Sequence, residues 1–166
     1  MLAQWLRRNA HKRSANTLRI VANLWRPFRG AGIKIVDVAD DYREIKVQMK
    51  LRWYNKNYVG TQFGGSMYAM TDPFYMMMLI NNLGSEYIVW DKGAQIDFIK
   101  PGRSTVHAHF IFTESEIADI KQQANTNKKY VFQKPVDIID DEGTLIASVI
   151  KTLYVRKKTP LRDNAN

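Results

Sequence analysis

The chain has 166 residues, of which 45% are hydrophobic, and it contains no cysteine. This length suits one domain with one core, and the absence of thiols excludes a cysteine nucleophile, a cysteine-ligated metal and a disulfide. The net charge of +9 is unevenly distributed, because residues 1–29 hold seven basic and no acidic side chains, whereas the remainder holds 18 basic and 16 acidic ones. Binding of nucleic acid would depend on this leader alone, and we expect no nucleic-acid partner.

Residues 1–29 predict a basic amphipathic N-terminal helix. Leu18, Val21, Ala22 and Trp25 recur at helical spacing and form one apolar stripe, which Pro27 should end. Such a helix can lie on an anionic membrane, but packing against its own domain is the favoured interpretation. No apolar run approaches the roughly 18 residues of a membrane span, and the start lacks the features of a signal peptide. We expect a cytoplasmic protein.

From residue 30 onward the hydrophobic pattern predicts strands. Apolar and polar residues alternate over residues 30–41 and 42–53, and Asp40 and Asp41 mark a hairpin turn between the two segments. Four further strands are predicted at residues 86–99, 103–113, 128–139 and 144–157. Residues 114–127 are polar and indicate a loop with at most a short helical piece. Residues 159–166 should form a frayed tail.

The segment between the two groups of strands is almost free of charge. It runs over residues 57–84, NYVGTQFGGSMYAMTDPFYMMMLINNLG, and Asp72 is its one charged residue. From Met67 to Ile80 apolar residues occupy every direction of a helical wheel, so a helix here would be buried on all sides. A carboxylate in such surroundings needs hydrogen bonds or a proton.

Two interpretations of Asp72 remain open on spacing alone. Asp72 could be the N-cap of a helix that begins at Pro73 and ends before Gly84. Alternatively, one long helix could run from about Gly65 to Leu83 with a kink at Pro73. Its length of roughly 28 Å would match the width of six strands. In either case, antiparallel strands with a single buried helix predict an α+β fold, in which one six-stranded antiparallel sheet wraps around a central helix.

Several separate motifs in this chain resemble the hotdog-fold thioesterase superfamily. Asn57, the pair Gly64 and Gly65, and Asp72 are similar to the Asn…HisGlyGly…Asp pattern of the phenylacetyl-CoA-type branch. The run QIDFIKPG at residues 95–102 resembles that family's strand-to-turn signature, and DDEGTLIA at residues 140–147 resembles its last hairpin. The helix sequence TDPFYMMM suggests a subgroup of its own. The resemblance covers residues 23–157 and favours the long, kinked helix.

The resemblance implies a hotdog domain over residues 30–158 and an activity, which is hydrolysis of an acyl-CoA thioester to a free acid and CoA without a cofactor. It implies a homodimer, or a homotetramer formed from two dimers. Asp72 would act as general base or nucleophile, Asn57 would hold water or substrate, and a backbone N–H of Gly65 would stabilise the developing oxyanion. The expected substrate-binding residues are Thr61, Gln62, Phe63, Gly64 and Ser66.

One departure from the family pattern matters for function. Phe63 stands where many relatives have a histidine before the glycine pair. Since hotdog dehydratases rely on that histidine, Phe63 argues against dehydratase or hydratase chemistry. It also supports a rival hypothesis, in which the protein is a non-catalytic acyl-CoA-binding or lipid-binding module.

No metal site is expected from the sequence. His107 and His109 are two residues apart and share one strand face, but no third ligand accompanies them. The opposite face of that strand carries core residues, so these histidines should lie at a surface or a subunit contact.

Overall fold

The structure is a computed structural model that describes residues 14–158. Its strands are β1 (Ile33–Val38), β2 (Glu44–Met49), β3 (Tyr87–Phe98), β4 (Val106–Ile111), β5 (Tyr130–Asp140) and β6 (Leu145–Lys157). Its helices are α2 (Ala15–Leu24), α3 (Arg26–Ala31), α4 (Gly64–Ala69), α5 (Phe74–Leu83) and α6 (Glu114–Thr126). Every strand falls where hydrophobic alternation predicts one.

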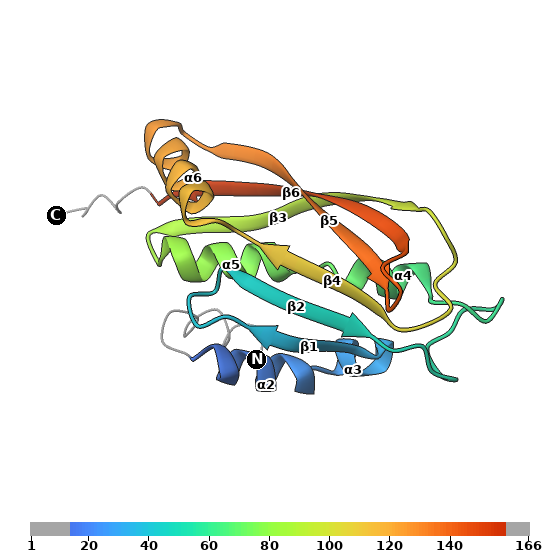
Figure 1. Ribbon diagram of the computed structural model, residues 1–166. Coiled ribbons are helices and arrows are strands. Elements are labelled where there is room, and N and C mark those ends of the chain that lie inside the picture. The colour runs from blue at the N-terminus through green and yellow to red at the C-terminus, as the bar shows by residue number, and fades with distance from the viewer. Residues whose placement is uncertain (1–13, 159–166) are drawn as a thin grey trace, which may run out of the picture.

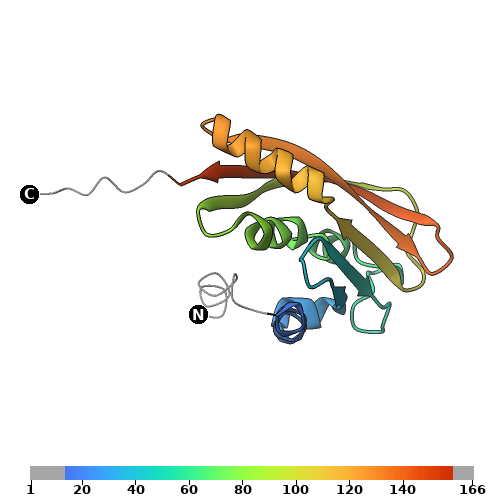
Figure 2. The ribbon, with the colours of Figure 1, turned by 60° about the vertical axis from the view of Figure 1, so that its left-hand side comes forward.

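The six strands form a single sheet in the order β1-β2-β4-β5-β6-β3, and every neighbouring pair is antiparallel. Figures 1 and 2 show this sheet curling around α5. Phe74 and Tyr75 at the start of α5 are buried and pack against the ring of Phe110 on β4. Burial of such large aromatic side chains supplies much of the stability of a core of this size. The arrangement confirms the predicted hotdog fold.

The central helix is interrupted. The last cap of α4 is at Met70, and α5 begins after Pro73, so residues 70–73 separate two helical pieces. A proline inside a helix has no N–H to donate and its ring clashes with the preceding turn, which accounts for a break at this point rather than a mild kink. The alternative role of Asp72 as an N-cap is wrong, because Pro73 occupies the cap position and no side chain caps α5.

The N-terminal segment contains two helices where one was expected. Pro27 does not end the apolar stripe but lies in the first turn of α3, a position that suits proline. Leu18 and Ala22 of α2 are buried, whereas Trp25 lies between the helices and stays 41% exposed. The expected helix also included residues 1–13, which lie outside the described residues. No helix within residues 14–158 is long and apolar enough to cross a membrane.

Helix α2 occupies the open edge of β1. The side-chain amide of Asn23 accepts from the Ile35 N–H at 2.8 Å and donates to the Ile35 carbonyl at 2.9 Å, as a neighbouring strand would. Arg19 donates to the carbonyl of Val36 at 3.1 Å. These contacts protect one edge of the sheet from pairing with another chain. The opposite edge, formed by β3, has no strand beside it among the described residues.

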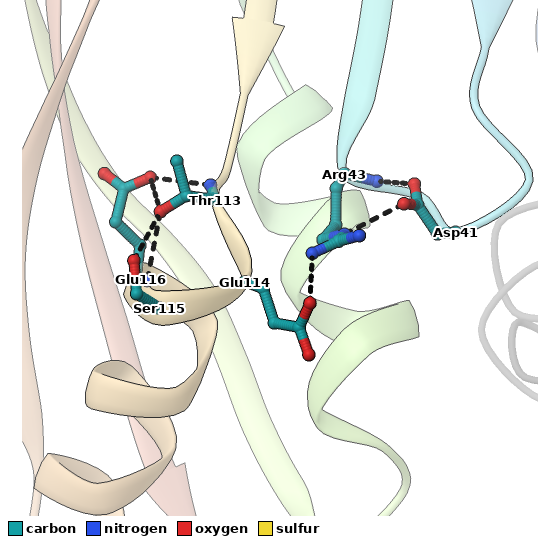
Figure 3. Close-up of polar contacts among 6 residues, drawn as sticks. All are labelled: Asp41, Arg43, Thr113, Glu114, Ser115 and Glu116. Atoms are coloured by element: carbon teal, nitrogen blue, oxygen red, sulfur yellow. Dashed lines mark hydrogen bonds and ion pairs between the residues drawn. The ribbon is translucent and has the colours of Figure 1, made fainter.

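Residues 114–127 do not form the loop expected from their polarity, because α6 fills nearly all of this segment. Figure 3 shows the capping box that starts the helix: the Thr113 side chain accepts from the Glu116 N–H, and the Glu116 carboxylate accepts from the Thr113 N–H. In the same view Arg43 bridges Asp41 and Glu114. Helix α6 buries only Ile120 and Ala124, so the capping box that starts it is a stronger helix signal than its weak apolar stripe.

Replacing Thr113 by alanine is expected to destabilise the protein by about 1 kcal/mol, because it leaves the first-turn N–H groups of α6 without their cap. Urea unfolding followed by circular dichroism would measure the change. Thr113→Ser is the matched control, since serine keeps the hydroxyl that accepts the hydrogen bond. Equal stability of the alanine variant and the wild type would show that the capping box contributes nothing.

Candidate active site

Asp72 lies at the break between α4 and α5, and its side chain is half exposed. Its backbone N–H donates to the carbonyl of Ala69 at 3.2 Å, so the residue continues from the last turn of α4. Its Oδ1 accepts a hydrogen bond from Lys151 Nζ at 3.1 Å, and the two side chains form an ion pair. The carboxylate therefore reaches solvent on one side and a buried cation on the other.

Lys151 occupies an unusual place in β6. It lies in phase with Val149, Leu153 and Val155, all of which are fully buried core residues, and it is itself only 1% exposed. A buried ammonium is strongly destabilising unless counter-charges surround it. Two carboxylates and the ring of Tyr68, whose centroid lies 5.7 Å from Nζ, provide those surroundings.

The second carboxylate belongs to Asp91 on β3. Asp91 follows Tyr87 and Val89 on the inward face of the strand, and its side chain is only 9% exposed. Its Oδ2 lies 2.8 Å from Lys151 Nζ. Beyond this ion pair, neither carboxylate oxygen makes a well-directed hydrogen bond within residues 14–158. Asp72, Lys151 and Asp91, here called the buried triad, thus join the helix break to two adjacent strands.

The charged groups of the triad shift the pKa values of Asp91 and Lys151. Burial raises the pKa of Asp91 to about 6, the nearby Asp72 carboxylate adds to the increase, and Lys151 opposes it. Burial alone would lower the pKa of Lys151, but its contacts with Asp91 and Asp72 raise the value above that of an ordinary lysine. Lys151 therefore stays positively charged between two acidic groups.

The side chain of Asn57 holds the loop before α4 through hydrogen bonds within that loop. Its side-chain oxygen accepts from the N–H groups of Val59 and Thr61, and its amide nitrogen donates to the Thr61 hydroxyl and the Gln62 carbonyl. Gln62 is buried, and its amide nitrogen donates to the carbonyls of Met49 and Ser104. Three of the expected site residues are therefore engaged in positioning the chain that leads into α4.

Aromatic rings lie against both glycines at the start of α4. A methyl group on Gly64 would come within 2.9 Å of the Phe98 ring, and one on Gly65 within 2.6 Å of the Phe63 ring. Both rings are more than half exposed. In this structure the space beside each glycine, which has no side chain of its own, holds one of the protein's own rings.

Ser66 and Phe63 face an open pocket of about 320 Å³ next to α4. The remaining lining residues are Gly30, Ala31, Tyr54, Asn55 and Lys56. The pocket places Lys56, a cation, beside exposed aromatic surface, which is a combination suited to a ligand with an apolar part and an anionic part. Sequence reasoning selected Phe63 and Ser66 for binding and did not select Tyr54 or Lys56.

The structure thus brings Gly64, Gly65, Ser66 and Asp72 onto one short helix and its end, with Asn57, Thr61, Gln62 and Phe63 leading into it. Lys151 and Asp91 were missed by the sequence reasoning. A signal for Lys151 was present, since it interrupts an otherwise apolar alternation in the last strand. His107 and His109, on the exposed face of β4, pair with Asp141 and Glu44.

The comparisons with known proteins fix the family. The family described as "Domain of unknown function (DUF4442)" matches residues 14–155. The chain belongs to this family. A search of curated proteins gives no match.

Solved structures agree with the fold. A Pseudomonas aeruginosa protein described as a probable thioesterase superimposes with a TM-score of 0.71 at 13% sequence identity, covering 94% of this chain and 96% of that chain. A thioesterase from Haemophilus influenzae gives a TM-score of 0.63 at 17% identity, with coverages of 93% and 96%. A Chlorobaculum tepidum protein of unknown function gives 0.69 at 15% identity, with coverages of 87% and 94%. At these identities the likeness establishes the hotdog fold.

Proposed function

We propose that this protein hydrolyses an acyl-CoA thioester to a free acid and CoA. The observation that carries the proposal is the half-exposed carboxylate of Asp72, which lies at the break in the central helix of a hotdog fold and is bound from inside by Lys151. The thioesterase descriptions of two structural neighbours support the same reaction class. No cofactor enters the proposed reaction.

In the proposed reaction Asp72 acts as general base. Its carboxylate takes a proton from a water molecule while the water oxygen bonds to the thioester carbonyl carbon. The tetrahedral intermediate then loses the thiolate as the carbon–sulfur bond breaks, and the proton held by Asp72 passes to the sulfur. Direct attack by the Asp72 carboxylate, followed by hydrolysis of the resulting anhydride, is the alternative form of the same chemistry.

The remaining site residues are assigned to oxyanion stabilisation, to positioning of the chain or to substrate contact. A first-turn N–H of Gly65 would donate to the developing oxyanion, since the first N–H groups of a helix lack partners within it. Asn57 and Thr61 would hold the loop in place, and Gln62 and Gly64 would set the start of the helix. Phe63 and Ser66 would contact the substrate from the pocket side.

A non-catalytic acyl-CoA-binding or lipid-binding protein is the second candidate. It is favoured by the aromatic rings of Phe63 and Phe98, which lie against the two glycines where the family pattern has a histidine and open backbone. Exposed aromatic rings of this kind can bind an acyl chain without any hydrolysis of its thioester.

A thiol-release assay across short, medium, long and aromatic acyl-CoAs tests the two candidates, with acyl-CoA binding measured in parallel by calorimetry. Release of free CoA above the uncatalysed rate on at least one substrate is expected. Measurable binding without release on any of them would favour the binding protein, and absence of both would reject an acyl-CoA ligand altogether.

We also propose a homodimer joined through β3, which two such dimers could extend to a tetramer, and a cytoplasmic location where acyl-CoA is available. The contrast between the two sheet edges supports the dimer. Asn23 and Arg19 occupy the edge of β1, whereas β3 is long and has no strand beside it within residues 14–158. Light scattering at micromolar protein concentration should give at least twice the chain mass of 19.3 kDa. A monomer mass would reject this assembly.

A further inference from the structure

Lys151 needs an explanation beyond stability. Its position in β6 is one of four successive inward positions, and the other three hold Val149, Leu153 and Val155. An apolar side chain at such a position is generally as stabilising as a buried ion pair or more so, because no charge has to leave water. The presence of a lysine at this position therefore indicates that its positive charge acts on another side chain.

The geometry divides the triad into an outer and an inner part. Asp72 is 50% exposed, whereas the side chains of Asp91 and Lys151 are 9% and 2% exposed. Only Asp72 can meet a substrate, and the two inner residues can act only through it. Asp72 accepts a side-chain hydrogen bond from Lys151, and its carboxylate also lies beside that of Asp91.

Resting on the proposed function, we propose that Lys151 is a positioning residue for Asp72, held in place from the inside by Asp91. Asp72 lies in the irregular backbone between α4 and α5, outside both helices. The bond from Lys151 Nζ to Oδ1 restrains the rotation of the carboxylate and so directs it toward the side open to solvent. Asp91 supplies a second counter-charge, which keeps the ammonium at this depth.

The chain offers a matched control for this proposal. Lys134 on β5 is the register partner of Lys151 and lies on the same side of the sheet. It forms an ion pair with Glu116 of α6 instead of with the triad. Lys134→Gln therefore removes the same charge from the neighbouring strand without touching Asp72.

The test compares Lys151→Gln, Lys151→Arg and Lys134→Gln with the wild type by steady-state kinetics on the best acyl-CoA substrate. Misplacement of a reacting group by about 1 Å can reduce the rate about a hundredfold. We expect Lys151→Gln to reduce kcat about ten- to a hundredfold with little change in KM, Lys151→Arg to recover part of the loss, and Lys134→Gln to retain the wild-type kcat. A folded Lys151→Gln variant with wild-type kcat would overturn the proposal.

Crystal structures of Lys151→Gln and Lys134→Gln supply a second readout that does not depend on turnover. The Asp72 carboxylate should change its orientation only in the first variant, and an unchanged carboxylate there would overturn the positioning role. If Lys151→Gln does not fold, Asp91→Asn takes its place, with the same expected displacement of Asp72 and loss of kcat. Absence of thiol release by the wild type would reject the thioesterase, while the crystal structures would still decide whether Lys151 positions Asp72.

Discussion

Asp72→Asn is expected to reduce kcat by about 10²–10⁴ while the fold is retained, because loss of a general base costs a rate factor of that size. Asparagine keeps the shape of the side chain and still accepts a hydrogen bond from Lys151, but it cannot take a proton from water or attack a carbonyl. Lys151 keeps Asp91 as its counter-charge in the variant. The free energy of unfolding should therefore change by only about 1 kcal/mol, which corresponds to a few degrees in Tm.

Thiol-release kinetics and thermal unfolding, measured on the same preparation, separate a loss of chemistry from a loss of structure. Asp119→Asn is the matched control, since Asp119 is an exposed aspartate on α6. Wild-type turnover in Asp72→Asn would remove the only base proposed for the reaction and leave the binding protein as the better hypothesis. A collapse of Tm together with kcat would assign Asp72 to the fold.

The strands of the sheet could be predicted from sequence because the pattern that indicates each strand lies within that strand's own residues. Each strand shows its own alternation of apolar and polar residues, and a helix that is apolar on all sides can be buried only inside a curled sheet. The order of the strands in the sheet was not predicted and comes from the structure. Alternation indicates which face of a strand is inward but not which strand lies beside it.

The helices show where local reasoning fails. Helix α6 has few apolar residues, so its hydrophobic pattern is weak, yet the Thr113–Glu116 capping signal was present and was overlooked. The break at residues 70–73 could be placed near Pro73, but its extent depends on how the sheet and the triad hold Asp72. Helix propensity alone cannot predict how such tertiary contacts set the length of the break.

The triad could not be predicted as a unit. Lys151 is 79 positions away from Asp72 in the chain, and only the pairing of β3 with β6 brings Asp91 near both. The sequence did contain a signal for Asp91 and Lys151, because each occupies an inward position in a strand where apolar and polar residues alternate. A charge in phase with core residues indicates either a buried ion pair or a functional site, and the partner identifies which.

Asp91→Asn should change the pH dependence of stability. Burial raises the pKa of Asp91 to about 6 in the folded protein, against 3.8 for an ordinary aspartate, with Asp72 and Lys151 as its charged neighbours. Between these two values the folded state binds a proton that the unfolded state does not, so Asp91 contributes more stability as the pH falls from about 6 to about 4. The gain of the wild type relative to Asp91→Asn across this window should be of the order of 2–3 kcal/mol.

Urea unfolding of both proteins at several pH values between about 3 and 8 measures this difference directly, because titrations common to both chains cancel when the two free energies are subtracted. Asp41→Asn provides a comparison of opposite sign. The backbone N–H and the guanidinium of Arg43 lower the pKa of Asp41, so the stability it contributes is lost only as the pH falls below about 4. A difference between wild type and Asp91→Asn that stays constant from pH 8 to pH 4 would mean that Asp91 remains ionised in the fold. Lys151 would then have an ionised Asp91 beside it across that whole range.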